Sequence, residues 1–237
     1  MSRAEWPAVL PGSPSLGRAL RRAAEDLYFH GVRLVPANLA WGIVLLGAVV
    51  LAGGSLLGIA LVLALVPLTF GLMGMAATLV RERTLVMSDL ARSIRTDFQR
   101  RFALGLTQIG LTAVALVDLG LGLQLGGMFG LVLVVIAAYT LLAIWILAVV
   151  AWPLVMDPIR ASMPIRSRLR LAGLLVLAHP VRFTALAAVL AVLVLAGAVL
   201  AAALLMFAAA YVALVAAHFV LPAADRLEGR GALPPEG

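Results

Sequence analysis

The sequence contains no cysteine and no lysine, and only 12% of its residues are charged. Without cysteine, disulfide bonds, thiolate catalysis and cysteine-ligated metal sites are excluded. The sequence also lacks a G-x-S-x-G nucleophile motif, an H-E-x-x-H zinc motif and a phosphate-binding glycine loop. Its three histidines have no metal-like partner spacing. We therefore predict a protein that is not an enzyme, with no catalytic residues, no metal site and no cofactor.

Apolar residues fill the place of the missing charge. Hydrophobic residues make up 64% of the 237-residue chain, and the mean hydropathy is +1.12. A soluble domain is typically about 45–50% apolar, and a chain of this size has no core large enough to bury more. The bilayer must act as part of the solvent. The composition therefore predicts an integral membrane protein.

The 18 basic residues, all arginine, occur in clusters separated by apolar blocks at 34–80, 102–156 and 183–222 that contain none. An arginine at the centre of a membrane helix costs about 2.5–3.5 kcal/mol on insertion, and basic loops stay cytoplasmic. Each block should therefore leave the cytoplasm and return to it. The net charge of +7 marks loops and forms no single patch, so we expect no nucleic-acid partner. Abundant alanine and glycine without lysine is typical of a GC-rich bacterial genome, which predicts the bacterial plasma membrane with a cytoplasmic N-terminus.

The length of the blocks predicts the number of spans. One crossing of a hydrocarbon core about 30 Å thick needs about 20 residues, so each block is long enough for two. We expect an all-α polytopic transmembrane helix bundle, with six spans arranged as three hairpins linked by cytoplasmic amphipathic helices. Five spans, with one long tilted helix in the last block, are the alternative. The predicted spans are 34–52, 57–80, 103–123, 128–152, 183–200 and 203–222, within one transmembrane domain at 34–222.

The remaining segments are predicted to be cytoplasmic. Residues 1–33 form an N-terminal segment with an amphipathic helix, and 223–237 form a short disordered tail with the C-terminus inside. In the connectors, Leu90, Ile94, Phe98 and Phe102 recur at helical spacing, so this segment should lie in the headgroup plane with its apolar side down. The basic positions expected to face anionic headgroups are Arg92, Arg95, Arg100, Arg101, Arg166, Arg168 and Arg170.

An internal repeat is a second interpretation of the arginine pattern. Arg33, Arg101 and Arg182 precede the three outward spans, as expected if one unit of amphipathic helix and hairpin occurs three times. Selection for basic cytoplasmic loops alone would produce the same arginines. Both interpretations stay open.

Few polar residues lie within the spans, so each is a candidate for function or for helix packing. Asn38 and Trp41 open the first span, and Pro67 with Thr69 should kink the second, where Thr69 can bond the backbone that proline frees. Asp118 is the one acid inside a predicted span. It is either an interfacial carboxylate near the outer turn or a proton or cation site facing the bundle interior.

Several short motifs resemble those of the YesL-like family of small polytopic bacterial membrane proteins: Asn38-Leu-Ala-Trp41, Pro67-Leu-Thr69, Leu79-Val-Arg81, the basic segment from Asp89 to Phe102, and Ala178-His179-Pro180. The chain departs from the family pattern at His179, where asparagine is usual, and at Glu82, where glycine is common. The resemblance covers most of residues 28–222. It implies a small membrane protein that is an accessory to a carbohydrate uptake system.

Three functions are consistent with these observations. The first is a non-enzymatic accessory or scaffold subunit, with a transporter permease or a second copy of the chain as its partner. The second is a small transporter or channel that uses the Asp118 region and the Pro67 kink. The third is binding to the anionic headgroups of the bilayer through the connector arginines, which is compatible with either.

Overall fold

The computed structural model describes residues 15–51, 55–86, 88–200 and 207–230. Within these ranges the fold is all-helical, and six helices are long and apolar enough to cross a membrane. These six are α1 (Leu16–Val50), α2 (Leu56–Glu82), α4 (Phe98–Leu125), α5 (Gly127–Met156), α7 (Pro180–Val199) and α9 (Ala209–Leu227). Shorter helices connect them: α3 (Ser88–Arg95), the 3-10 turn η1 (Pro158–Arg160) and α6 (Ile165–Ala178). The predicted six-span helix bundle is confirmed.

Some predicted features fall on residues that the structure does not describe. The first turn (52–54), the start of the sixth span (203–206), most of the N-terminal segment (1–14) and the end of the C-terminal tail (231–237) lie outside the described residues.

The first helix joins two segments that the sequence analysis separated. α1 begins after Ser15, whose hydroxyl accepts a hydrogen bond from the backbone N–H of Arg18 at 3.3 Å, and it continues for 35 residues. No cap or glycine stop occurs near Arg33, and Ala23 and Leu34 are buried on either side of it. Arg33 therefore marks a change in the surroundings of the helix and not its beginning.

The second hairpin turns at two glycines. Gly126 and Gly127 both have φ of +62°, a left-handed conformation that glycine adopts without strain. The turn lies where it was predicted. At the other end, α4 begins at Phe98 and not near residue 103, because Asp97 with φ of +53° separates it from α3.

The sequence predicted that the connector helix would lie with its apolar side toward the acyl chains. α3 does not have this orientation. Its apolar side packs on α2. A Cβ added at Gly71 would lie 2.4 Å from Leu90 Cδ1, and one added at Gly74 would lie 2.3 Å from Ser93 Oγ. Glycines on α2 thus provide the room for α3, and Leu90 of the connector packs against the protein core.

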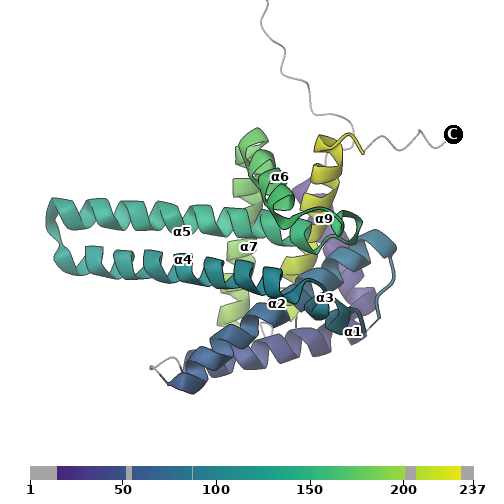
Figure 1. The fold of residues 1–237 in the computed structure, drawn as a ribbon, viewed down its shortest axis with the longest axis horizontal. Helices are drawn as coiled ribbons and strands as arrows, with labels where there is room; N and C mark the ends of the chain where they lie inside the picture. The colour runs from purple at the N-terminus through teal and green to yellow at the C-terminus, as the bar shows by residue number, and fades with distance from the viewer. Residues whose placement is uncertain (1–14, 52–54, 87, 201–206, 231–237) are drawn as a thin grey trace, which may run out of the picture.

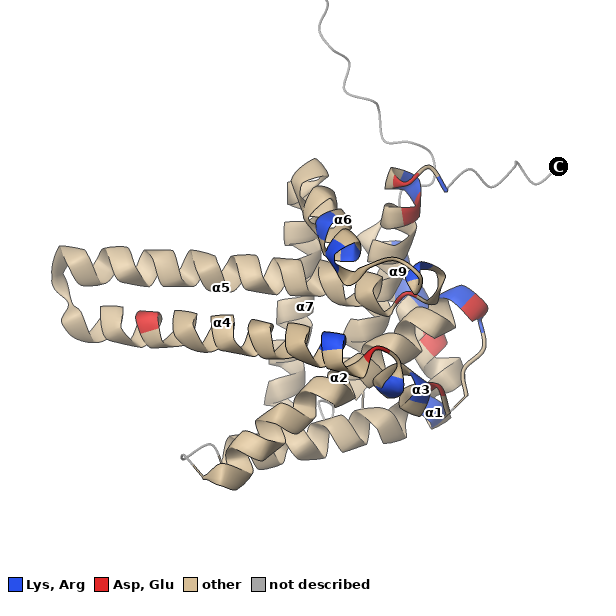
Figure 2. Cartoon of the chain, viewed as in Figure 1, with Lys and Arg blue, Asp and Glu red and all other residues tan. Residues whose placement is uncertain are grey.

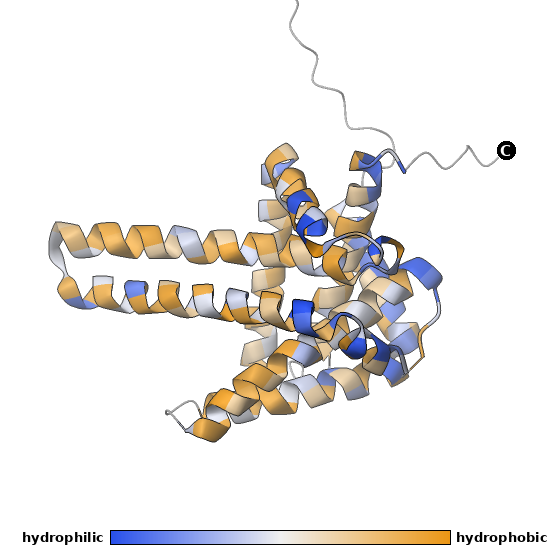
Figure 3. Ribbon diagram, in the orientation of Figure 1, coloured by the Kyte–Doolittle hydropathy of each residue, from blue (hydrophilic) through white to orange (hydrophobic). Residues whose placement is uncertain are grey.

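The hairpins α1–α2 and α4–α5 diverge from a common end, near which α3 and α9 also lie (Figure 1). The arginines gather at that end, and the long arms of both hairpins are apolar (Figures 2 and 3). We call this end the charged layer; its residues come from the connectors and the adjoining helix ends.

The third pair, α7 and α9, is arranged differently. α9 packs mainly on α1 and α2 and less on α7, its partner in sequence. The backbone N–H of Ala210 at its start donates to Asn38 Oδ1 at 2.6 Å. Along α1, Asn38 is five residues past Arg33 and Val50 is seventeen, which correspond to roughly 8 Å and 26 Å of helix rise. The start of α9 thus lies much closer to the charged layer than the tip of the first hairpin does. The internal repeat stays a hypothesis. If it exists, its third unit, α7 with α9, is arranged differently from the first two hairpins.

Candidate functional site

The charged layer contains a buried ion cluster, which we define as Arg81, Asp157, Arg160, Asp225 and Glu228. Arg81 Nη2 lies 2.7 Å from Asp157 Oδ2, and its Nη1 lies 2.6 Å from Asp225 Oδ2. Arg160 Nη2 lies 2.7 Å from Asp225 Oδ1 and 2.6 Å from Glu228 Oε2, and its Nη1 pairs with Asp157. The cluster thereby joins α2, the end of α5 with η1, and α9.

Burial decides what this cluster can do. The side chains of Arg160 and Asp157 are both fully buried. Burial alone lowers the pKa of Arg160, but hydrogen bonds with Glu228 and Asp225 raise it above its ordinary value. All three carboxylates pair with guanidinium groups. The described residues contain no group of acids and histidines that could hold a metal ion. The cluster holds α2, the end of α5 and α9 together.

The ion cluster could not be predicted while the residues after 222 were expected to form a disordered tail. α9 in fact continues to Leu227, and two of its last acids pair with distant arginines. The available signal was Asp157, an acid placed directly after a long apolar span and before Pro158.

A second buried pair joins α1 to α9. His218 Nε2 lies 2.6 Å from Asp26 Oδ2, and Arg83 Nη1 lies 3.8 Å from the other oxygen of the same carboxylate. His218 therefore has a polar partner from another helix, and the pair holds α9 along the first helix.

Three of the predicted positions lie at helix contacts. Asn38 is fully buried and binds the start of α9, as described above. Trp41 Nε1 donates to Thr69 Oγ1 at 3.0 Å, which links the first two spans. Thr69 in turn donates to the carbonyl of Leu65 at 2.8 Å. The carbonyl that Pro67 leaves without a donor is that of Leu63, four residues earlier, so the bond expected from Thr69 goes elsewhere.

Asp118 lies apart from these contacts. It is partly exposed on α4, and no hydrogen bond or ion pair is found for it within the described ranges. Figure 2 shows the single acid of α4 on the outer arm of the hairpin, away from the arginines. It is not among the residues that line the cavities described below.

The predicted headgroup arginines divide into two groups. Two of the seven are buried, so they do not face headgroups as predicted: Arg101 donates to the carbonyl of Ser93 at 2.9 Å, and Arg168 donates to the carbonyls of Val155, Ala161 and Met163. Burial lowers the pKa of Arg168 below its ordinary value. These two hold connectors in place, and the other five are exposed: Arg92, Arg95, Arg100, Arg166 and Arg170.

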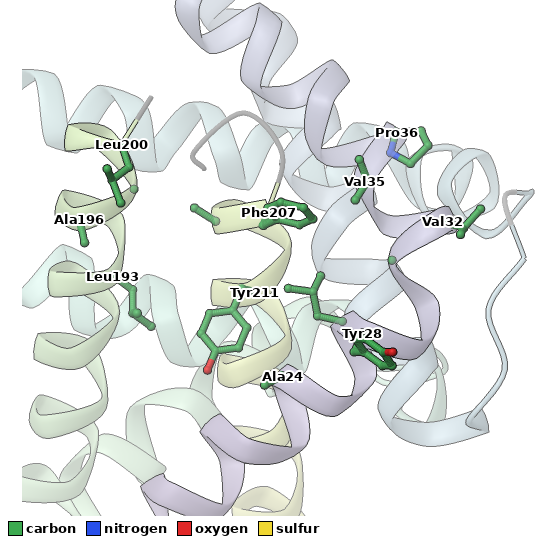
Figure 4. A pocket seen from close by; sticks show the side chains of 14 residues that line it. Ala24, Tyr28, Val32, Val35, Pro36, Leu193, Ala196, Leu200, Phe207 and Tyr211 are labelled. Atoms are coloured by element: carbon green, nitrogen blue, oxygen red, sulfur yellow. The ribbon is translucent and has the colours of Figure 1, made fainter. Parts of the chain in front are cut away.

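The cavities among the spans include two that differ in their lining. One, of about 840 Å³, lies between α1, the end of α7 and the start of α9 (Figure 4). Its lining is apolar except for Tyr28 and Tyr211, and the Tyr211 hydroxyl already donates to the carbonyl of Leu20 at 3.1 Å. Its lining includes Leu200 and Phe207, and the residues between these two lie outside the described ranges.

The other cavity, of about 380 Å³, lies between the first two hairpins, and we call it the inter-hairpin groove. Its polar lining consists of five side chains from four helices: Trp41, Thr69, Gln108, Thr112 and Trp152. Of these, Trp41 and Thr69 are among the polar candidates predicted from the sequence.

Comparison with known proteins does not add a family. No family model, curated protein or solved structure matches this chain. Six apolar helices nevertheless identify it as a multi-pass integral membrane protein.

Proposed function

We propose that this protein is a non-enzymatic accessory or scaffold subunit that presents the α4–α5 hairpin to a membrane span of a separate protein. The supporting observation is how little of this hairpin the chain itself covers. Only 11% of the apolar window of α4 and 17% of that of α5 are buried, compared with 67% for α9.

One exposed face of α4 has the residues that favour close helix contact. Ala103, Thr107, Gly110, Val114 and Val117 recur at intervals of three and four residues, and all are exposed. Small residues let helix backbones approach in a membrane, where van der Waals packing drives association. A Cβ at Gly110 would meet no atom within 4 Å, whereas one at Gly105 would lie 2.3 Å from Val66 Cγ1. The protein's own packing therefore requires Gly105 but not Gly110.

The buried ion cluster supports a scaffold role from the other end of the molecule. It fixes the base of α5 to α2 and α9, so the hairpin projects from a rigid support. The one-sided charged layer supports a cytoplasmic position for that base, with both termini inside the bacterial plasma membrane. The resemblance to YesL-like proteins supports a carbohydrate uptake permease as the partner.

Site-specific photo-crosslinking in the membranes of the native bacterium tests the proposal. A photoreactive residue at Thr107 should give one discrete adduct with another membrane protein, and the same residue at exposed Ala138 on α5 should not. Gly110→Leu should abolish the adduct, and Gly120→Leu, which adds the same bulk on another side of α4, should leave it. An adduct between two copies of this chain, or equal yields at Thr107 and Ala138, would contradict the proposal.

A further inference from the structure

The inter-hairpin groove has a polar end whose hydrogen-bonding groups are only partly used. Trp152 Nε1 donates to Gln108 Oε1 at 2.7 Å, and the Trp152 ring stacks on Phe70 at a centroid distance of 5.3 Å. These contacts fix Gln108 by its oxygen. Among the described residues, no hydrogen bond is found for the Gln108 amide nitrogen or for the Thr112 hydroxyl. An amide nitrogen donates two hydrogen bonds, and a hydroxyl both donates and accepts. The groove therefore offers donors and an acceptor at one end.

An apolar cavity adjoins the groove. A second cavity of about 270 Å³ shares Val62 and Ile109 with the groove and extends along α2 past Ile59. The one polar side chain there, Ser55, is already used: it donates to the carbonyl of Leu51 and accepts from the N–H of Gly58, both at 3.0 Å. The two cavities thus adjoin one another, and the polar groups without a partner lie in the groove.

The mouth of the groove is at the surface of the spans. Val62 and Leu116 line it and are 37% and 53% exposed. Both lie within membrane-spanning helices, so the groove opens to hydrocarbon and a ligand would enter from the bilayer. The lining of both cavities contains no charged residue. An ionised headgroup would lose its hydration there without gaining a counter-ion, which is strongly unfavourable.

Packing between α4 and α2 sets the level of the polar groups. Gly105 on α4 packs on Val66 of α2, so these two residues lie at one level. From this level Gln108 is three residues farther from the charged layer, about 4–5 Å, whereas Thr112 on α4 and Ile59 on α2 are each seven residues farther, roughly 10 Å. Gln108 is therefore the polar group nearer the charged layer, and Thr112 lies at about the level of Ile59.

We propose that the inter-hairpin groove binds an uncharged lipid with one free hydroxyl, of the diacylglycerol class. The lipid hydroxyl hydrogen-bonds Gln108 and Thr112, and one acyl chain lies along Val62 and Ile109 toward Ile59. The groove, of about 380 Å³, lies within the range found for small-molecule sites, about 300–1,000 Å³. The site is independent of the partner proposed for α4, because the small-residue face lies on the other side of that helix.

Quenching of indole fluorescence tests this site, because Trp41 and Trp152 line the groove. The full chain with Trp6→Phe and Trp145→Phe, which retains only these two indoles, is placed in phosphatidylcholine nanodiscs. Dibrominated diacylglycerol should quench its fluorescence saturably, and dibrominated phosphatidylcholine or phosphatidylglycerol should quench it less. Equal quenching by all three lipids would overturn the proposal.

Matched variants locate the binding. Thr112→Val removes the hydroxyl at the groove and should weaken diacylglycerol binding roughly fivefold, the effect of one hydrogen bond. Thr140→Val removes a hydroxyl that is exposed on α5 and bonded to the carbonyl of Ile136, and it should change nothing. Ala113→Phe fills the groove and should abolish binding, and Ala138→Phe is its control on α5. If Thr112→Val binds as tightly as Thr140→Val, the assignment is wrong, even if Ala113→Phe fails to fold. No partner protein is present in these nanodiscs, so the result is independent of the scaffold proposal.

Discussion

Arg160→Met should destabilise the protein more than any substitution of an exposed arginine. Arg160 is fully buried and pairs with Asp157, Asp225 and Glu228. Its removal leaves Glu228 with Arg230 at 3.5 Å as its remaining cation, and Asp157 and Asp225 must share Arg81. Two carboxylates would then share one partly buried guanidinium.

The size of the effect follows from burial. Removing one partner of a buried ion pair costs about 3–5 kcal/mol, because the remaining charge stays buried without compensation. The side chains of Asp225 and Glu228 are 19% and 16% exposed, so water partly solvates their charges. We therefore expect a loss near the lower end, about 3 kcal/mol.

Equilibrium unfolding in detergent micelles, followed by tryptophan fluorescence, measures this loss. The matched control is Arg92→Met. Arg92 is 74% exposed and lies 3.4 Å from Asp89, so its removal should change the free energy of unfolding by less than about 1 kcal/mol. Equal stability of the two variants would refute the structural role of the ion cluster.

Three further substitutions test individual contacts in the same unfolding assay. Asn38→Leu should cost about 1–3 kcal/mol, because it leaves the backbone N–H at the start of α9 buried without an acceptor; a loss no larger than that of Gln124→Leu, which replaces an exposed amide, would contradict this contact. Gly105→Val should destabilise by about 1–3 kcal/mol through the clash with α2, whereas Gly110→Val should be close to neutral if α4 has no partner in the micelle. Asp118→Asn should change stability by less than about 0.5 kcal/mol, because within the described residues it has no ion pair to lose, and a large loss would mean that a partner exists.

The sequence predicted the helices well because one strong physical term controls them. Arginine is excluded from hydrocarbon, so the gaps between arginines delimit the apolar spans. The turn at Gly126 and Gly127 was predictable for a different reason, because this glycine pair interrupts a long apolar block. The local conformation at Asp97 and the continuity of α1 past Arg33 were not, because hydropathy does not report where a helix ends.

The charged layer was only partly predictable. The pattern located the arginines near the membrane surface, but it could not distinguish exposed Arg92 from buried Arg168, since both belong to amphipathic segments. That difference depends on contacts between residues distant in sequence, such as Arg81 with Asp225. The groove was missed for a similar reason. Gln108 and Thr112 share one face of α4, but their significance appears only when Trp152 and Trp41 are brought beside them.

Topology is the most direct test of the account, and the absence of cysteine makes it straightforward to measure. Single cysteines are introduced by Arg92→Cys in the charged layer and by Leu125→Cys at the tip of the α4–α5 hairpin, which is 61% exposed. A membrane-impermeant maleimide applied to intact spheroplasts should label the cysteine at 125, and the one at 92 only after permeabilisation. The opposite labelling pattern, or labelling of both cysteines in intact spheroplasts, would contradict the assignment of the arginine-rich end to the cytoplasm.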